Sequence, residues 1–422
     1  MTAPAIGASS IMGIAFEQLA APVQSAPATA TTGGTIAAGV YRIVVTALNA
    51  NGETLPSNEQ SITTTGSTST ITVNWATVAG ATGYKVYVTT AGGATLTETL
   101  QTTVGAVITA TITAIAAGTA LPTQNTASSS GTYAAPTKYL PFLSESLTFQ
   151  QDTQWRRPIR NTAAVIGAIP GDSHIEGDIT FEALSDVIIY FLAATRCSVT
   201  KTGTGPFTYT FTPTSAAIPT ETMSITIVRN GQVFGYTGCV VSSFRITVDN
   251  EVLQMSVSIL GRDEASQGPV TATWPVSTPF GAGQYNLQVP TGSPVTDSDS
   301  FEFSVDDNGT PNYRLQSTTR GPAFINFGES AAQLTLNRDF ITRADYDNFK
   351  ALTAQSVTLA ATKGASESVT LLMPAAVKDT YETQIGGEGD LIRASITYQG
   401  VIDGTGKHYL ITVVTPTENM LN

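Results

Sequence analysis

The sequence predicts a mainly β protein made of two tandem antiparallel β-sandwich domains, each flanked by a short helix, and a third β-sandwich inserted near the N-terminus. Charged residues are only 12% of the chain, and Thr, Ser, Ala and Gly separate short runs of Val and Ile. This composition favours strands joined by turns over helical bundles. A length of 422 residues allows about two to four domains. The third observation is that segments of the last two thirds recur in the same order.

The recurrence consists of three pairs of segments, whose offsets differ modestly, as loops of different length in two copies would produce. Residues 146–149 match 300–303 at an offset of 154, 177–181 match 332–336 at an offset of 155, and 253–261 match 392–400 at an offset of 139. Each copy also holds one segment with helical spacing, at 183–194 and at 343–353. We therefore expect each copy to be mostly strand, with a single helix that covers a sheet.

Residues 21–134 differ from the rest of the chain in charge. They hold only five charged residues, Arg42, Glu53, Glu59, Lys85 and Glu98. Strand-like runs at 39–47, 70–75 and 84–88 are separated by turns rich in Asn and Gly.

Part of this segment resembles fibronectin type III and immunoglobulin-like modules. The resemblance is carried by residues 41–47, 52–57 and 81–87 and by Trp75. The tryptophan follows the Gly-Glu-Thr turn, which departs from the usual order of those modules. The resemblance implies a β-sandwich.

The segments before and after the module are better interpreted as parts of one arm than as two separate pieces. Residues 11–17 end at a stretch rich in Ala, Pro and Thr, and residues 131–142 begin after a Ser/Gly linker. We predict that the module is inserted into an N-terminal arm, because insertions are tolerated at exposed loop tips. The predicted organisation is a first copy at 1–20 and 135–265, the inserted module at 21–134, a linker at 266–294, a second copy at 295–415, and a C-terminal tail at 416–422.

The charge and the cysteines narrow the classes of function. A net charge of −12 argues against a role that neutralises phosphates, whereas an acidic surface suits a protein that must not adhere to nucleic acid. Cys197 and Cys239 are too few for a disulfide framework and are expected as small buried residues. Residues 1–18 do not resemble a signal peptide, and no stretch reaches the roughly 18 apolar residues of a transmembrane helix. We expect synthesis in the cytoplasm and no membrane partner.

The sequence predicts no catalytic residue, no cofactor and no metal. His174 is expected in a solvated turn, and neither it nor His408 has a second ligand at metal spacing. Glu176 and Asp178 lie two residues apart on a predicted strand. A glycosidase would use such a pair, but any strand with one polar face shows the same spacing.

Strict alternation is the strongest pattern in the two copies. In the predicted strand at 175–182, Ile175, Ile179 and Phe181 face one side, and Glu176, Asp178 and Glu182 face the other. Such strands pack one face on a core and leave the other face wet. Their long edges would aggregate in a monomer, and closure of a barrel between subunits would remove them. The pattern therefore predicts a ring.

Trp155, Arg156, Arg157 and Arg160 form the strongest basic cluster, in a predicted loop between two strands. Arginines beside an aromatic ring can hold phosphate and stack on bases. Because the chain is otherwise acidic, we expect these residues to contact an acidic partner, either the neighbouring subunit or the next ring.

An ordered set of segments carries a second resemblance. It consists of residues 13–17, 135–147, the GDITFE strand at 177–182 with the apolar helix after it, 235–246 and 260–261. This set resembles the major tail tube proteins of long-tailed, non-contractile phages. The resemblance covers 1–20 and 135–262, and extends to 295–415 through the repeat.

The resemblance implies a structural virion protein of the tail, made in the host cytoplasm, that forms stacked rings around a channel for DNA. Such rings are usually hexamers, so two tube domains per chain imply a ring of three chains with pseudo-sixfold symmetry. The implied partners are other copies of the chain, the tape measure and tail terminator proteins, and DNA in transit. Glu176, Asp178 and Glu182 are the candidate lumen-facing residues, because acidic faces repel phosphates. The inserted module would provide a site for host-surface glycans.

Two other functions stay open on the sequence. A glycan-binding surface protein or virion decoration protein would also be built from β-sandwich modules. A β-rich glycosidase would need a carboxylate pair in a cleft lined by aromatic residues, which are 8% of the chain.

Overall fold

The computed structural model describes residues 10–123, 125–157, 164–203, 205–219, 221–249, 252–275, 277–315, 319–385, 387–388 and 390–417. They form two compact units, a small unit of residues 17–130 and a large unit of residues 10–16 and 131–417. Strands make up 52% of the chain and helices 3%, which confirms the prediction of a mainly β protein. In the described part of the chain, no helix is long and apolar enough to cross a membrane.

The small unit consists of two antiparallel sheets that share one core. The sheets have the orders β4-β3-β6-β7 and β2-β5-β8. The strands are β2 (Ala28–Ala30), β3 (Gly39–Leu48), β4 (Gln60–Thr64), β5 (Thr70–Asn74), β6 (Gly83–Val88), β7 (Thr99–Gly105) and β8 (Thr109–Ile112). Side chains from both sheets, such as Ile43 and Val73, are completely buried in one cluster, in which the rings of Trp75 and Tyr84 lie 5.3 Å apart.

The two ends of the small unit are joined by backbone contacts. The amide of Ser129 donates to the carbonyl of Glu17 at 2.7 Å, and the amide of Leu19 donates to the carbonyl of Ala127 at 2.9 Å. The chain therefore enters and leaves this unit at neighbouring points.

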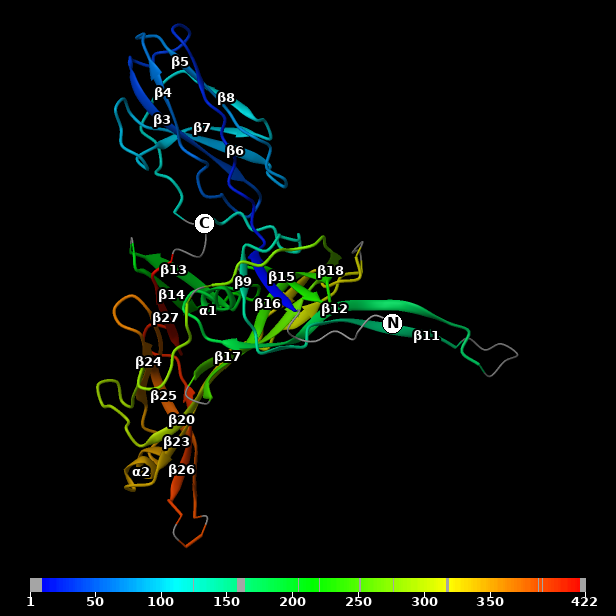
Figure 1. The fold of residues 1–422 in the computed structure, drawn as a ribbon, viewed down its shortest axis with the longest axis vertical. Coiled ribbons are helices and arrows are strands. Elements are labelled where there is room, and N and C mark those ends of the chain that lie inside the picture. The colour runs from blue at the N-terminus through cyan, green and yellow to red at the C-terminus, as the bar shows by residue number, and fades with distance from the viewer. Residues whose placement is uncertain are drawn as a thin grey trace. The chain divides into compact units, whose positions relative to one another are not determined.

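The large unit is built on an antiparallel sheet of eight strands, here called the long sheet (Figure 1). Its order is β10/β11, β12, β17, β16, β20, β23, β26 and β25. The strands are β10 (Ser144–Glu145), β11 (Thr148–Arg156), β12 (Gly167–Glu182), β17 (Val252–Gly261), β16 (Gln232–Asp249), β20 (Ser298–Asp306), β23 (Ala331–Asp339), β26 (Arg393–Gly400) and β25 (Ser368–Gln384). β10 and β11 pair with β12 in one continuous register and act as one strand.

The first parts of β16 and β25 each belong to a second group of strands. Around β16 lie β9 (Lys138–Leu140), β1 (Ile11–Phe16), β15 (Met223–Arg229) and β18 (Asp263–Ser266). Around β25 lie β19 (Tyr285–Gln288), β24 (Gln355–Thr362), β27 (Leu410–Thr415), β14 (Phe207–Pro213) and β13 (Cys197–Thr202). A separate pair is formed by β21 (Thr310–Asn312) and β22 (Phe324–Asn326).

One side of the long sheet is apolar and covered. Helix α1 (Ile188–Ala193) covers β12, where the rings of Phe181 and Phe191 lie 4.7 Å apart. Tyr409, just before β27, covers the middle of the sheet and lies 6.2 Å from the ring of Phe303. Helix α2 (Ala344–Lys350) covers β25, with 5.6 Å between the rings of Tyr346 and Tyr381. The alternation predicted for β12 is confirmed, because Ile175, Ile179 and Phe181 are all completely buried.

Both helices are shorter than the sequence predicted. The first was expected at 183–194, but the amide of Ala183 bonds to the carbonyl of Leu253, and a turn at 185–187 precedes the helix. The second was expected at 343–353. Every residue of α1 is buried, whereas no residue of α2 is. Helical spacing marks an apolar stripe, but the competing hydrogen bonds of a neighbouring strand decide where the helix begins.

The strands of the two halves have the same pairing order. The first half of the long sheet has the order β10/β11, β12, β17 and β16. The second half has the order β20, β23, β26 and β25, so each strand of one half has a counterpart in the other. A bulge interrupts β16 between Val241 and Ser243, and another interrupts β25 between Lys378 and Thr380, at the matching place opposite β17 and β26.

The register corrects two offsets of the predicted repeat. Val257 and Ile396 match at the offset of 139, and they pair with Ile179 and Leu336. The offset between β12 and β23 is therefore 157 rather than 155, and that between β10/β11 and β20 is 156 rather than 154. Side chains alternate with a period of two, so a shift of two residues keeps every side chain on its face and escapes detection from the sequence.

The segment 266–294 is not only a linker. β19 lies within it and pairs with β24, as β1 pairs with β15, and Phe280 is completely buried. The Pro and Gly content of this segment indicated a linker, but a strand of four residues is too short to leave a pattern against that background.

Candidate functional site: the polar face of the long sheet

The side of the long sheet opposite the apolar core is polar over all eight strands, and it is here called the polar face. Paired residues share a side of a sheet, so the register identifies its members. They include Thr148, Gln150, Glu176, Asp178, Thr180, Glu182, Gln254, Ser256, Ser258, Ser243, Arg245, Thr247, Glu302, Ser304, Gln333, Thr335, Asn337, Ser395, Thr397, Gln399, Thr380 and Glu382. Both halves of the large unit therefore contribute to one surface.

Hydrogen bonds between neighbouring strands connect these side chains. The Ser258 hydroxyl donates to Asp178 Oδ1 at 2.7 Å, and the Gln333 amide donates to Gln399 Oε1 at 3.0 Å. The hydroxyls of Thr180 and Ser256 lie 2.9 Å apart, and those of Thr335 and Thr397 lie 3.2 Å apart. Pairs of this kind stabilise a sheet and fix its register. The polar face is an ordered layer of hydroxyl, amide and carboxylate groups.

Carboxylates outnumber cations on the polar face. Among side chains that the structure describes on it, the acidic ones are Glu176, Asp178, Glu182, Glu302, Asp306, Asp339 and Glu382, and the basic ones are Arg245 and Arg393. Both arginines are paired, Arg245 with Glu302 at 3.3 Å and Arg393 with Asp299. The surface therefore carries a net negative charge, which repels phosphate groups.

The basic cluster lies at the far end of a β-ribbon and not in a loop, which corrects the prediction for its first two residues. β11 and β12 project from the large unit as a two-stranded ribbon (Figure 1), in which Trp155 pairs with Ala168 and Arg156 with Gly167. Trp155 is 61% exposed, Arg156 and Arg157 are exposed, and Arg160 lies outside the described residues.

Pro170 and the nearby glycines are turn residues by local preference, but this part of the chain belongs to β12. β17 pairs only with residues 175–182 of β12, so Pro170 lies where β12 has β11 as its sole strand partner in the described part of the chain. Proline is tolerated at such an edge. His174, expected in a turn, is also in β12, and its Nδ1 lies 3.1 Å from the Tyr313 hydroxyl.

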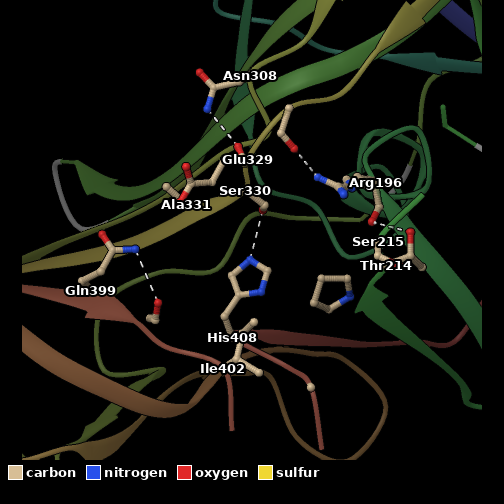
Figure 2. Close-up of a pocket in the computed structure, with 14 residues that line it drawn as sticks. Arg196, Thr214, Ser215, Asn308, Glu329, Ser330, Ala331, Gln399, Ile402 and His408 are labelled. Carbon is tan, nitrogen blue, oxygen red and sulfur yellow. Dashed lines mark hydrogen bonds between the residues drawn. The ribbon is translucent and has the colours of Figure 1, made fainter. Parts of the chain in front are cut away.

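A second polar site is a groove of about 1050 Å³ between the β13–β14 hairpin and the ends of β23 and β26. Figure 2 shows His408 directed at Ser330, with 3.0 Å between Nε2 and the hydroxyl oxygen. Arg196 donates to the carbonyl of Gly328 at 2.5 Å, and Asn308 donates to the carbonyl of Glu329 at 2.9 Å. These polar groups bond to the groove's own walls, and the bond from Arg196 to Gly328 connects the first half of the large unit to the second.

The position of His408 in this groove predicts that the stability of the fold depends on pH. Burial, together with the charge of Arg196, lowers the pKa of His408 below its ordinary value. The unfolded chain therefore takes up a proton more readily than the folded chain, and stability is lost as pH falls through about 6.5. We expect the melting temperature of the wild type to fall between pH 7 and pH 5 by more than that of His408→Gln, measured by calorimetry. Equal falls in both proteins would contradict this role of His408.

Sequence reasoning missed an ion network around the buried Lys378, which holds α2 on the long sheet. Lys378 is 1% exposed, and its ammonium lies 2.6 Å from Asp345 Oδ1. Arg338 lies 3.1 Å from the other oxygen of Asp345 and donates to Asp297 at 3.0 Å. The order of charges along the chain gave no signal for this network, because Asp297 and Lys378 are 41 and 33 residues from their partners.

Comparison with protein families matches residues 127–400 to the phage tail tube protein family. A search of curated proteins gives no match. The matched residues make up more than half of the chain and include all eight strands of the long sheet.

Proposed function

Because the chain belongs to the phage tail tube protein family, we propose that it assembles into stacked rings that form the tube of a phage tail and conduct DNA. The family is structural, so the chain is a component of the virion tail and its role is not enzymatic. The observation that carries the proposal is the long sheet, which has one covered apolar side and one acidic polar face.

On this proposal, each chain supplies two tube domains and three chains make a ring with pseudo-sixfold symmetry. The common pairing order of the two halves and the bulges at matching places support the duplication. The first proposed tube domain consists of residues 10–16 and 131–266, and the second consists of residues 280–415. The second domain includes β19, because β19 pairs with β24.

The polar face lines the lumen. Glu176, Asp178 and Glu182 belong to this face, and its negative charge keeps contacts with DNA weak and transient. A lumen of hydroxyl groups bonded to one another offers few free donors to phosphate oxygens. The tape measure protein would occupy this channel before DNA, and the terminator would close the end of the tube.

Trp155, Arg156 and Arg157, with Arg160, contact the neighbouring subunit or the next ring. Support comes from the place of Trp155 and Arg156 at the end of a projecting ribbon, where both side chains are exposed. The rest of the chain is acidic, so a second copy offers carboxylates to these arginines.

The small unit is an inserted immunoglobulin-like module that is exposed on the assembly and is available to host-surface glycans. The paired backbones at Glu17 and Ser129 support the insertion, because removal of the module leaves two ends that already adjoin.

We expect deletion of residues 18–129 to leave assembly of the large unit intact. The deletion joins Glu17 to Ser130 and removes none of the strands of the large unit. Electron microscopy of the deletion variant is the measurement, with circular dichroism as the control for folding. A variant that is folded but does not assemble would contradict the insertion.

Negative-stain electron microscopy of the purified full chain tests the proposed function. Hollow rings or tubes with threefold repeats are the expected result. A chain that stays monomeric over a wide range of concentration and is retained on a glycan column would instead identify a glycan-binding decoration protein.

A further inference from the structure

We propose that the free edge of β25 in one chain pairs with the free edge of β10/β11 in the next chain, in the register of the internal β16–β20 junction. This inference rests on the proposed ring and names the contact that closes it. The partner is a second copy of this chain.

The internal junction serves as the template. β16 and β20 join the two halves of the long sheet, with Ser243 opposite Asp306 and Thr247 opposite Glu302. On the apolar side, the rings of Phe244 and Phe303 lie 6.2 Å apart. On the polar face, Arg245 pairs with Glu302. Five residue pairs therefore connect one half to the other with both faces continuous.

β25 is the counterpart of β16. Aligning their bulges relates the two strands by an offset of 137, so residues 243–247 of β16 correspond to 380–384 of β25. In β16, residues 243–247 have β17 on one edge and β20 on the other. In β25, residues 380–384 have β26 on one edge, and no described strand pairs with the other edge.

β10/β11 is the counterpart of β20. The offset of 156 relates residues 302–306 of β20 to 146–150. These residues pair with β12 on one edge, and no strand in the described part of the chain pairs with the other. These two stretches, which have no second strand partner in the described part of the chain, correspond to the two strands that join the halves of the long sheet.

The direction of the backbone amides shows which groups of the β10/β11 edge are free. The amide of Ser146 donates to the carbonyl of Asp178, so even-numbered residues of this strand bond to β12 and the amide of Phe149 points outward. The outward carbonyl of Leu147 accepts from Arg229 at 2.7 Å, and its amide donates to Glu145 at 3.1 Å. The unobstructed part of the edge is therefore 148–150.

The inferred register places Thr380 opposite Gln150, Tyr381 opposite Phe149, and Glu382 opposite Thr148. Tyr381 and Phe149 lie on the apolar side and are half-buried in the single chain, so their pairing buries aromatic surface. Polar residues again meet on the polar face. The contact pairs residues 148–150 of one chain with residues 380–382 of the next, so these stretches no longer present an open edge to other strands.

Cysteine cross-linking tests this register. The variant with Thr148→Cys and Glu382→Cys places two thiols opposite each other across the inferred contact. Thr148 is at a position where paired Cα atoms lie about 4.5 Å apart, within the range of a disulfide. Oxidation of assembled protein is expected to shift the band on a non-reducing gel from one chain of 44.0 kDa to three chains. The native Cys197 and Cys239 are buried and stay in place.

Two matched variants are the controls. Arg245→Cys with Ser304→Cys is the same pair at the internal junction, and its disulfide leaves the band at one chain. Thr148→Cys with Thr380→Cys shifts the register by two residues, where the diagonal Cα atoms would be about 7–8 Å apart, too far for a disulfide.

The outcomes separate this inference from the proposed function. One outcome is that the microscope shows rings or tubes but the cross-link does not form, or forms only in the shifted pair. This would contradict the inferred register and would still support the proposed ring. A cross-linked ladder that extends past three chains would support the register and overturn the three-chain ring. Protein that forms no rings and no cross-link would overturn both.

Discussion

Phe149→Pro is expected to abolish ring formation and to leave the chain folded. The amide of Phe149 points away from β12, so proline at this position removes no hydrogen bond within the chain. It does remove the donor that faces Tyr381 of the next chain, and its ring clashes with an approaching strand. Sedimentation should give a species of 44.0 kDa, and microscopy should show no rings.

Phe149→Ala is the matched control, because it loses the same half-buried ring but keeps the amide. It is expected to assemble, with weaker association than the wild type. Thr148→Pro removes an amide on the side of β12, so it should destabilise the chain itself, by about 1–3 kcal/mol for the unpaired carbonyl. Assembly of Phe149→Pro at the level of Phe149→Ala would show that this edge is not a subunit contact.

Asp345→Ala is expected to lower the free energy of unfolding of the large unit by about 3 kcal/mol. The ammonium of Lys378 is buried and bonds to the side chain and the carbonyl of Asp345. Removal of one partner of a buried pair leaves an uncompensated charge, which costs about 3–5 kcal/mol. We expect the low end because the Asp345 side chain is 30% exposed. The measurement is the urea midpoint of unfolding.

Lys378→Met separates the loss of the pair from the burial of a lone charge. It replaces the ammonium with an apolar group of similar length, and it leaves Asp345 bonded to Arg338. We expect a change of less than about 1 kcal/mol, because replacing a buried charge with an apolar group is often neutral. Equal losses in Asp345→Ala and Lys378→Met would mean that an ammonium left alone at this site adds no cost, which would contradict this explanation.

Much of the candidate site could be predicted from local alternation. A strand places successive side chains on opposite faces, so the alternation in β12 identified its apolar side and its polar side. The apolar side holds Ile175, Ile179 and Phe181, and the polar side holds Glu176, Asp178 and Glu182. The pairing of Arg245 with Glu302 could not be predicted. These residues meet only because β16 lies beside β20, and no local pattern encodes which strand becomes the neighbour.

The predicted loop at Trp155 and Arg156 failed for a related reason. Proline and glycine in residues 167–171 are turn residues by local preference, but the ribbon tolerates them because β11 is the only strand that pairs with β12 there among the described residues. Edge strands and central strands of a sheet tolerate different residues, and the sequence does not indicate which strands are at the edge.

Three properties of this protein could be predicted without its structure: the mainly β composition, the polar side of each amphipathic strand, and the resemblance to phage tail tube proteins. Composition and a period of two act within one strand, so they can be detected without the rest of the fold. The neighbour of each strand, the exact register, the lengths of the helices and the contact of the buried Lys378 with Asp345 became known from the folded chain. These depend on contacts between distant segments, and a shift of two residues leaves every side chain on the same face.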